Sequence, residues 1–135
     1  MASPRLLTLP RVAQIVGVEY RTLHSWLRRG LLRPSAQQSS GIGVPNLFSA
    51  DDVVQAKVIA DLRGYGLPFE RLSEAAEKLG AHPSALTQGA SVLVNGSVSI
   101  VEEADAGDAI KHESLTLVYN TGHAVRDIRA AIPSA

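Results

Sequence analysis

Hydrophobic and polar positions in the first 30 residues alternate with the period of short helices. Apolar residues recur at spacings i, i+3 and i+4 in residues 10–16 and again in residues 19–29. Gly17 separates the two segments, and Gly30 follows the second, where glycine commonly ends a helix. Two short helices joined by a tight turn that contains glycine are typical of a helix-turn-helix.

The segment that follows predicts part of a hairpin and two more helices. Residues 44–48 predict one strand of a small hairpin. Ser49 and Asp52 have the spacing of a capping box, which predicts a helix over about 50–63. A further helix is expected over about 68–79, with proline at its start.

The periodicity changes to that of strands further along the chain. Two β-rich runs, residues 91–94 and 97–101, flank Asn95-Gly96. Asn-Gly is the strongest short signal for a hairpin, because a type I′ turn needs positive φ at both central residues. The pattern therefore predicts a β-hairpin with a type I′ turn.

The last part of the chain predicts a third strand over 115–119 and a short helix over 125–132. His82-Pro83-Ser84 is interpreted as a boundary between two domains, residues 1–80 and residues 81–135. The predicted fold class is mainly α with a small β part: four short helices, a small hairpin or three-strand element, and a short C-terminal helix. We expect this second part to pack on the first domain or on a partner.

The charge of the chain is balanced as a whole but not along its length. Thirteen basic and thirteen acidic residues give a formal net charge of zero. Residues 1–40 hold six arginines against Glu19 alone, for a net +5, whereas residues 81–135 hold three basic and six acidic residues, for a net −3. Such asymmetry indicates a nucleic-acid-binding face at the basic end.

The composition argues against several other classes of protein. The absence of cysteine excludes disulfides, thiolate zinc sites and cysteine nucleophiles. The four histidines (24, 82, 112 and 123) lack metal-ligand spacing, so neither a metal nor another cofactor is expected. The sequence contains no run of about 18 apolar residues, so no membrane span is predicted. We therefore expect a cytoplasmic location.

A collinear series of short motifs carries a resemblance to a known family. The series is Gly17-Val18, Arg21-Thr22-Leu23, Trp26, Arg28, Gly30-Leu31-Leu32, Pro34, Phe48-Ser49-x-x-Asp52, Ile59-x-x-Leu62-Arg63-x-x-Gly66 and Phe69-Glu70-x-x-x-Glu74. It resembles the DNA-binding domain of the MerR family of bacterial regulators, over residues 7–80. The resemblance implies a winged helix-turn-helix that binds double-stranded DNA and regulates transcription as a homodimer.

The predicted recognition helix, residues 19–29, offers its polar side to DNA. Arg21 and Arg28 suit phosphate or guanine contacts, whereas His24 and Ser25 suit base edges. By the resemblance, His24 stands where family members commonly carry arginine, and Trp26 is interpreted as a core residue. The candidate DNA-binding residues are Arg11, Tyr20, Arg21, Thr22, His24, Ser25, Arg28, Arg29, Asn46 and Arg63.

The predicted wing departs from the family. Asn46 stands where the family usually carries an arginine that meets phosphate, so one charge is lost. Since counterion release scales with the number of neutralised phosphates, we expect a shallower salt dependence than is typical of the family.

The C-terminal part leaves two interpretations open. It is either a dimerisation hairpin or, by a faint resemblance to bacterial antitoxins, a region that binds a toxin. The candidate interface residues are Val92, Val94, Val98, Ile100, Leu115, Leu117 and Tyr119.

The sequence leaves two other functions open. An excisionase-like protein that bends DNA is a third alternative. An enzyme is the least favoured, because the acidic cluster Glu102, Glu103, Asp105 and Asp108 has no adjacent base or nucleophile.

Overall fold

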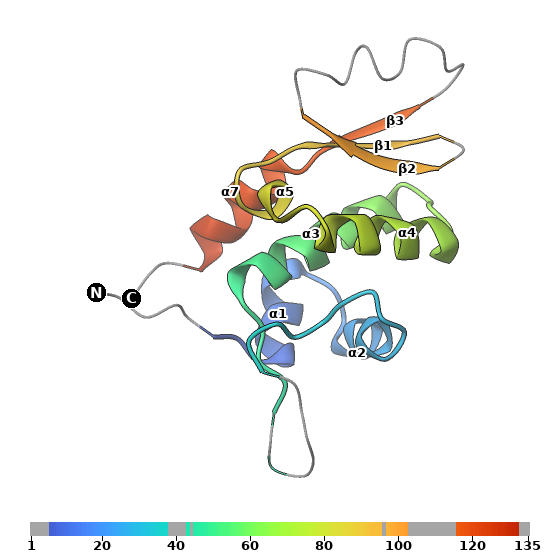
Figure 1. Ribbon diagram of the computed structural model, residues 1–135. Coiled ribbons are helices and arrows are strands. Elements are labelled where there is room, and N and C mark those ends of the chain that lie inside the picture. Colours follow the sequence, from blue (N-terminus) through green and yellow to red (C-terminus); the bar gives the residue numbers. More distant parts are fainter. Residues whose placement is uncertain (1–5, 38–42, 44, 96, 103–115, 133–135) are drawn as a thin grey trace.

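Two short helices form the helix-turn-helix at the N-terminal end of the molecule (Figure 1). The computed structural model describes residues 6–37, 43, 45–95, 97–102 and 116–132. Helix α1 spans Leu9–Val16 and α2 spans Tyr20–Arg28, close to the predicted bounds. Gly17 ends α1 with φ 80° and donates its N–H to the carbonyl of Ala13. This left-handed conformation is costly for residues with a side chain and explains the glycine in the turn.

A small wing follows α2. Gln37 and Leu47 exchange backbone hydrogen bonds of 3.1 and 2.8 Å, so the base of the predicted hairpin is present. Leu7 pairs in the same way with Phe48, which joins the wing to the N-terminal segment. Val44, in the predicted strand, lies outside the described residues.

Helix α3, Ala50–Gly64, begins with the predicted capping box. Asp52 accepts the N–H of Ser49 at 2.9 Å and donates its own N–H to the hydroxyl of Ser49 at 3.3 Å. The carboxylate of Asp52 also accepts both the N–H and the hydroxyl of Ser35, each at 2.8 Å. The start of the helix and the base of the wing are therefore fixed by the same carboxylate.

One hydrophobic core runs through the fold and is continuous across residue 80. It includes Leu23, Phe48 and Ile59 of the N-terminal part and Val92 and Ile128 of the C-terminal part. Helix α4, Phe69–Gly80, and helix α7, Gly122–Ala131, both contact α3. The C-terminal part thus packs on the N-terminal part, one of the two arrangements expected from the sequence.

A short helix, α5, covers Pro83–Thr87, where the sequence indicated only a boundary. Five residues are too few to show a helical period, so the pattern did not reveal it. Ala85 and Leu86 of this helix are buried in the common core. The division of the chain into two domains at this point stays a prediction.

Three antiparallel strands form the C-terminal sheet in the order β2-β1-β3. They are β1, Ser91–Val94, β2, Val98–Val101, and β3, Leu117–Asn120. The mainly α fold with a small β part and a C-terminal helix is confirmed.

The predicted type I′ turn is wrong. Val94 pairs with Val98, so three residues connect the strands rather than two. Asn95 does not have the positive φ that a type I′ turn requires. Instead, its side-chain oxygen accepts the N–H of Ser97 at 3.3 Å, a local bond that asparagine commonly makes in turns.

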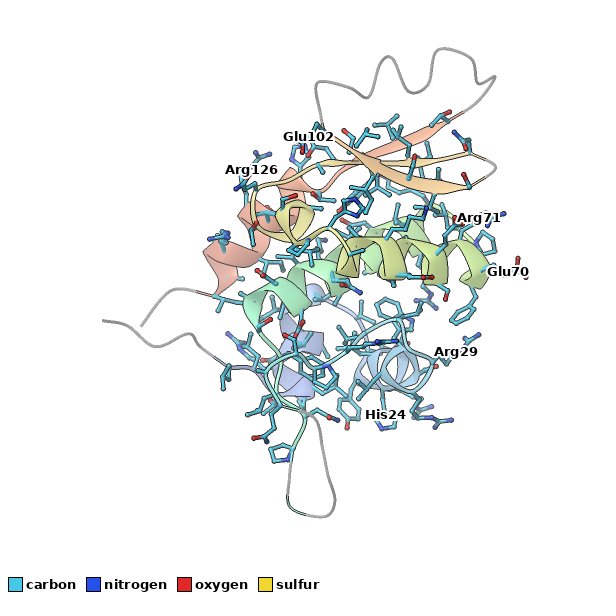
Figure 2. All side chains as sticks on the ribbon, in the orientation of Figure 1. His24, Arg29, Glu70, Arg71, Glu102 and Arg126 are labelled. Atoms are coloured by element: carbon cyan, nitrogen blue, oxygen red, sulfur yellow. The ribbon has the colours of Figure 1, made fainter. Side chains whose placement is uncertain are left out.

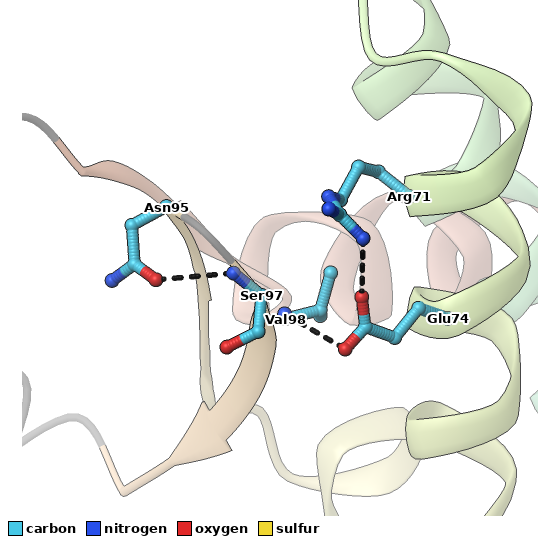
Figure 3. Close-up of polar contacts among 5 residues, drawn as sticks. All are labelled: Arg71, Glu74, Asn95, Ser97 and Val98. Carbon is cyan, nitrogen blue, oxygen red and sulfur yellow. Dashed lines mark hydrogen bonds and ion pairs between the residues drawn. The ribbon is translucent and has the colours of Figure 1, made fainter.

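Side-chain hydrogen bonds attach the sheet to the helices (Figure 3). Glu74 of α4 accepts the backbone N–H of Val98 at 3.1 Å and, through its other oxygen, a guanidinium N–H of Arg71 at 3.0 Å. Tyr119 of β3 donates its hydroxyl to Asp61 of α3 at 2.6 Å. The bonds of Glu74 to Val98 and of Tyr119 to Asp61 join residues more than 20 positions apart and fix the sheet against α3 and α4.

Thr121, between β3 and α7, forms the most buried of these connections. Its hydroxyl donates to the carbonyl of Ala85 at 2.6 Å and accepts the N–H of Ala90 at 2.9 Å. Its side chain is fully buried, so both bonds are shielded from water. A buried polar group is stable only with such partners.

Candidate nucleic-acid interface

Helix α2 has one buried side and one open side. Leu23 and Trp26 are buried in the core, which confirms Trp26 as a core residue. Arg21 and Arg28 are exposed, and Thr22 is partly exposed. The 3.6-residue period of the helix therefore places the predicted polar set on the open side.

An open hollow of about 400 Å³ lies beside α2. It is lined by Arg21, Thr22, Ser25, Trp26, Arg29, Leu31, Arg63, Leu67, Phe69 and Leu72. Five of the ten predicted DNA-binding residues meet here: Arg21, Thr22, Ser25, Arg29 and Arg63. The fold thus brings Arg63, at the end of α3, to residues that precede it by more than 30 positions.

The three arginines of the hollow carry positive charge that no described carboxylate neutralises. Among the described residues, Arg21, Arg29 and Arg63 have no carboxylate within ion-pair distance and no side-chain hydrogen bond. Arg29 instead lies over the ring of Phe69, with its Cζ atom 3.6 Å from the ring centroid. A hollow with unpaired guanidinium groups attracts an anion such as phosphate.

His24 and Tyr20 lie outside the hollow. In Figure 2, His24 points away from α3 and α4, whereas Arg29 lies near the end of α4 that carries Glu70. The rings of Tyr20 and His24 are 6.0 Å apart, and Tyr20 is half exposed. Arg28, also outside the hollow, is exposed at the end of α2.

The remaining two predicted residues belong to other elements. Arg11 is exposed on α1 and donates a hydrogen bond to Gln14 at 2.8 Å. Asn46 is partly buried in the wing. Neither residue lines the hollow, so the DNA-binding prediction for them rests on the sequence alone.

The sequence missed Phe69 as a residue of this surface. Its spacing fits the apolar stripe of Leu72, Ala76 and Leu79, which predicts that Phe69 faces inward with these residues. Its ring is in fact only partly buried and faces the arginine at the end of α2. Helical periodicity indicates which side of a helix is apolar but does not indicate which residue of another helix meets it.

Six of the seven predicted interface residues lie on one face of the sheet. The strand register places Val92 opposite Ile100 and Tyr119, and Val94 opposite Val98 and Leu117. All six pack on or within the core of the same chain. Their apolar character is therefore explained without a partner. Leu115, the seventh, lies outside the described residues.

Burial has a clear electrostatic effect at Tyr119. Loss of water contact and the hydrogen bond to the Asp61 carboxylate both raise the pKa of the Tyr119 phenol far above its usual range. The phenol therefore stays protonated and keeps donating its hydrogen bond.

Comparison with known proteins identifies the class of the chain. Residues 7–79 match the MerR HTH family regulatory protein, over more than half of the chain. The chain belongs to this family, which is one of regulatory proteins. The matched region contains α1 to α3, all of α4 except its last residue, and the whole hollow, so the surface described above belongs to the family domain.

Three relatives have the same degree of similarity. They are uncharacterized HTH-type transcriptional regulators, one from Mycobacterium bovis and two from strains of Mycobacterium tuberculosis. Each is 31% identical over 70 residues, which is 52% of this chain and 31% of the relative. The match thus spans about a third of the length of these relatives. No helix in the described part of the chain is long and apolar enough to cross a membrane.

Proposed function

We propose that the chain is a transcriptional regulator that binds specific double-stranded DNA and inserts α2 into the major groove. The observation that carries this proposal is the hollow beside α2, where arginines from α2, from the residue after it and from α3 meet without a described carboxylate partner. Guanidinium groups of this kind bind backbone phosphates, and phosphate contacts fix the register of a recognition helix.

Base reading is assigned to the part of α2 outside the hollow. His24 points away from the body of the molecule and has a ring that can donate or accept at a base edge (Figure 2). Arg28, exposed at the end of the helix, is assigned to phosphate. This division of roles makes different predictions for the two side chains.

Selection of bound sequences from a pool of random duplexes tests the proposal. We expect one enriched motif, and a palindromic motif would support binding as a homodimer. Recovery of no motif, with equal affinity for all duplexes, would refute specific recognition and favour a protein that binds DNA through its backbone alone.

Two variants then separate the roles on the selected duplex. H24A should relax the preference at one base pair, and R28A should weaken binding to all duplexes to a similar extent. If H24A weakens all duplexes equally, His24 does not read a base. The fold of both variants is checked by the fluorescence of Trp26, the only tryptophan in the sequence.

A further inference from the structure

The contact between Arg29 and Phe69 joins the end of α2 to the start of α4, two of the three helices that border the hollow. Arg29 directly follows α2, and Phe69 is the first residue of α4. The guanidinium carbon lies 3.6 Å from the centroid of the phenyl ring, and both residues line the hollow. The side chain at the end of the recognition helix is therefore held by a different element of the family domain.

This contact holds the arginine without using its hydrogen-bond donors. A cation is attracted to the face of an aromatic ring by the ring quadrupole, and the ring takes no conventional hydrogen bond from it. Among the described residues, the Arg29 side chain has no hydrogen bond or ion pair. Arg71, in contrast to Arg29, donates a hydrogen bond to Glu74 at 3.0 Å. Arg29 is thus restrained, and its N–H groups remain available.

We propose that Phe69 is a positioning residue that holds the Arg29 guanidinium at the hollow, where it binds a backbone phosphate of DNA. This inference rests on the proposed function. A free arginine loses side-chain entropy when it binds phosphate, whereas a restrained one has lost part of it beforehand. Phe69 therefore strengthens DNA binding without touching DNA.

A purely structural role for Phe69 makes a different prediction. Its ring is partly buried and packs against the hydrophobic core, so its loss alters local packing as well. Such a change acts on the whole hollow and does not depend on which arginine is present. The dependence on Arg29 is what distinguishes positioning from packing.

A double-mutant cycle tests the inference on the full chain. The probe is the duplex selected by the wild-type protein, and affinity is measured by fluorescence anisotropy. We expect F69L to weaken binding about 2- to 5-fold, the range of an exposed cation–π contact. F69Y keeps the aromatic face and should bind within about twofold of wild type. F69L should have no effect in an R29A background and its full effect in the matched R21A background.

The outcomes separate this inference from the proposed function. Wild-type affinity for F69L, or an undiminished effect of F69L in the R29A background, would overturn the positioning role and leave the proposed function intact. A wild-type chain that binds no duplex would overturn both. If F69L does not fold, as judged by Trp26 fluorescence, F69M replaces it in the same cycle with the same expected results.

Discussion

The polar side chains that join the C-terminal part to the helices are paired within the chain, whereas the arginines of the hollow beside α2 have no hydrogen-bond or ion-pair partner among the described residues. Glu74, Asp61 and Thr121 each bind a group from a distant segment at 3.1 Å or less. In the described part of the chain, Arg21 and Arg63 have no such partner. The first set stabilises the fold, whereas the second, by the function proposed above, binds DNA phosphate.

This contrast corresponds to the uneven distribution of charge along the sequence. Arginines of the basic N-terminal part meet at an open surface, together with Arg63 from α3. The C-terminal part contributes an apolar sheet face that its own chain covers. Substitutions should therefore divide into those that affect stability and those that affect DNA binding.

The largest loss of stability is expected at Thr121. The substitution T121V keeps the shape but leaves the carbonyl of Ala85 and the N–H of Ala90 without their buried partner. Two unsatisfied buried groups cost about 3 kcal/mol of unfolding free energy. Urea unfolding followed by Trp26 fluorescence measures the loss.

T87V is the matched control for this experiment. The hydroxyl of Thr87 donates to the carbonyl of Pro83 at 3.3 Å from a partly exposed position. We expect a loss within about 0.5 kcal/mol, as for other surface substitutions. Equal losses for T121V and T87V would show that the buried connection does not stabilise the fold.

A smaller loss is expected at Tyr119. Y119F removes the 2.6 Å hydrogen bond to Asp61, while Lys57 still lies 3.1 Å from that carboxylate. A hydrogen bond to a charged group contributes about 1.5–3 kcal/mol, and the remaining lysine places the loss near the lower end. Y65F is the control, because Tyr65 is 71% exposed and should change the unfolding free energy little. If the two variants are equally stable, the bond to Asp61 makes no net contribution to the unfolding free energy.

The same phenol predicts a loss of stability at alkaline pH. Its pKa is raised in the folded state, so above pH of about 10 the unfolded chain releases this proton while the folded chain retains it. The unfolded state then binds fewer protons, and stability falls as pH rises. Urea unfolding between neutral pH and pH of about 11 should show a shallower fall for Y119F than for wild type. An unchanged profile in Y119F would assign the fall to other groups.

Arg63 should affect DNA binding and leave stability unchanged. R63A removes one charge of the hollow, and we expect about tenfold weaker binding to the selected duplex and a salt slope reduced by about 1. R126A is the control, because Arg126 lies on α7, on the other side of the molecule from the hollow (Figure 2). Weaker binding by R126A than by R63A would show that DNA binds a surface other than the hollow.

The smallest effect is expected at Glu70, an exposed residue beside Phe69 at the start of α4. Its negative charge repels a phosphate in the hollow, and E70Q removes that charge without changing the shape. Because exposed charges interact weakly, we expect about twofold tighter binding at low salt and no gain at high salt. Glu102, at the far end of the C-terminal sheet in Figure 2, provides the control variant E102Q. A gain of the same size in E102Q would reflect net charge alone.

The sequence was sufficient for most elements because local signals define them. Gly17 marked the turn, and the capping box of Ser49 and Asp52 marked the start of α3. The five-residue α5 lacked such a signal. The three-residue turn after Val94 carried a misleading one, the Asn-Gly pair.

The candidate site was predictable only in part. The period of α2 identified Arg21, Thr22 and Ser25, but it could not show that Phe69 meets Arg29. The same limit applies to the sheet, where alternation revealed an apolar face but not that α4 packs against it. Contacts between distant elements depend on the tertiary fold, which one sequence pattern does not specify.

The most direct test of the central claim is the salt dependence of DNA binding by the triple variant R21A/R29A/R63A. Each neutralised phosphate contributes about −0.9 to the slope of log K against log salt, so three lost contacts should make the slope less negative by about 2.7. The unfolding free energy should fall by no more than about 1 kcal/mol, because none of the three arginines has a charged partner among the described residues and only the contact of Arg29 with Phe69 is lost. A slope equal to that of wild type would contradict the assignment of the hollow to DNA phosphate.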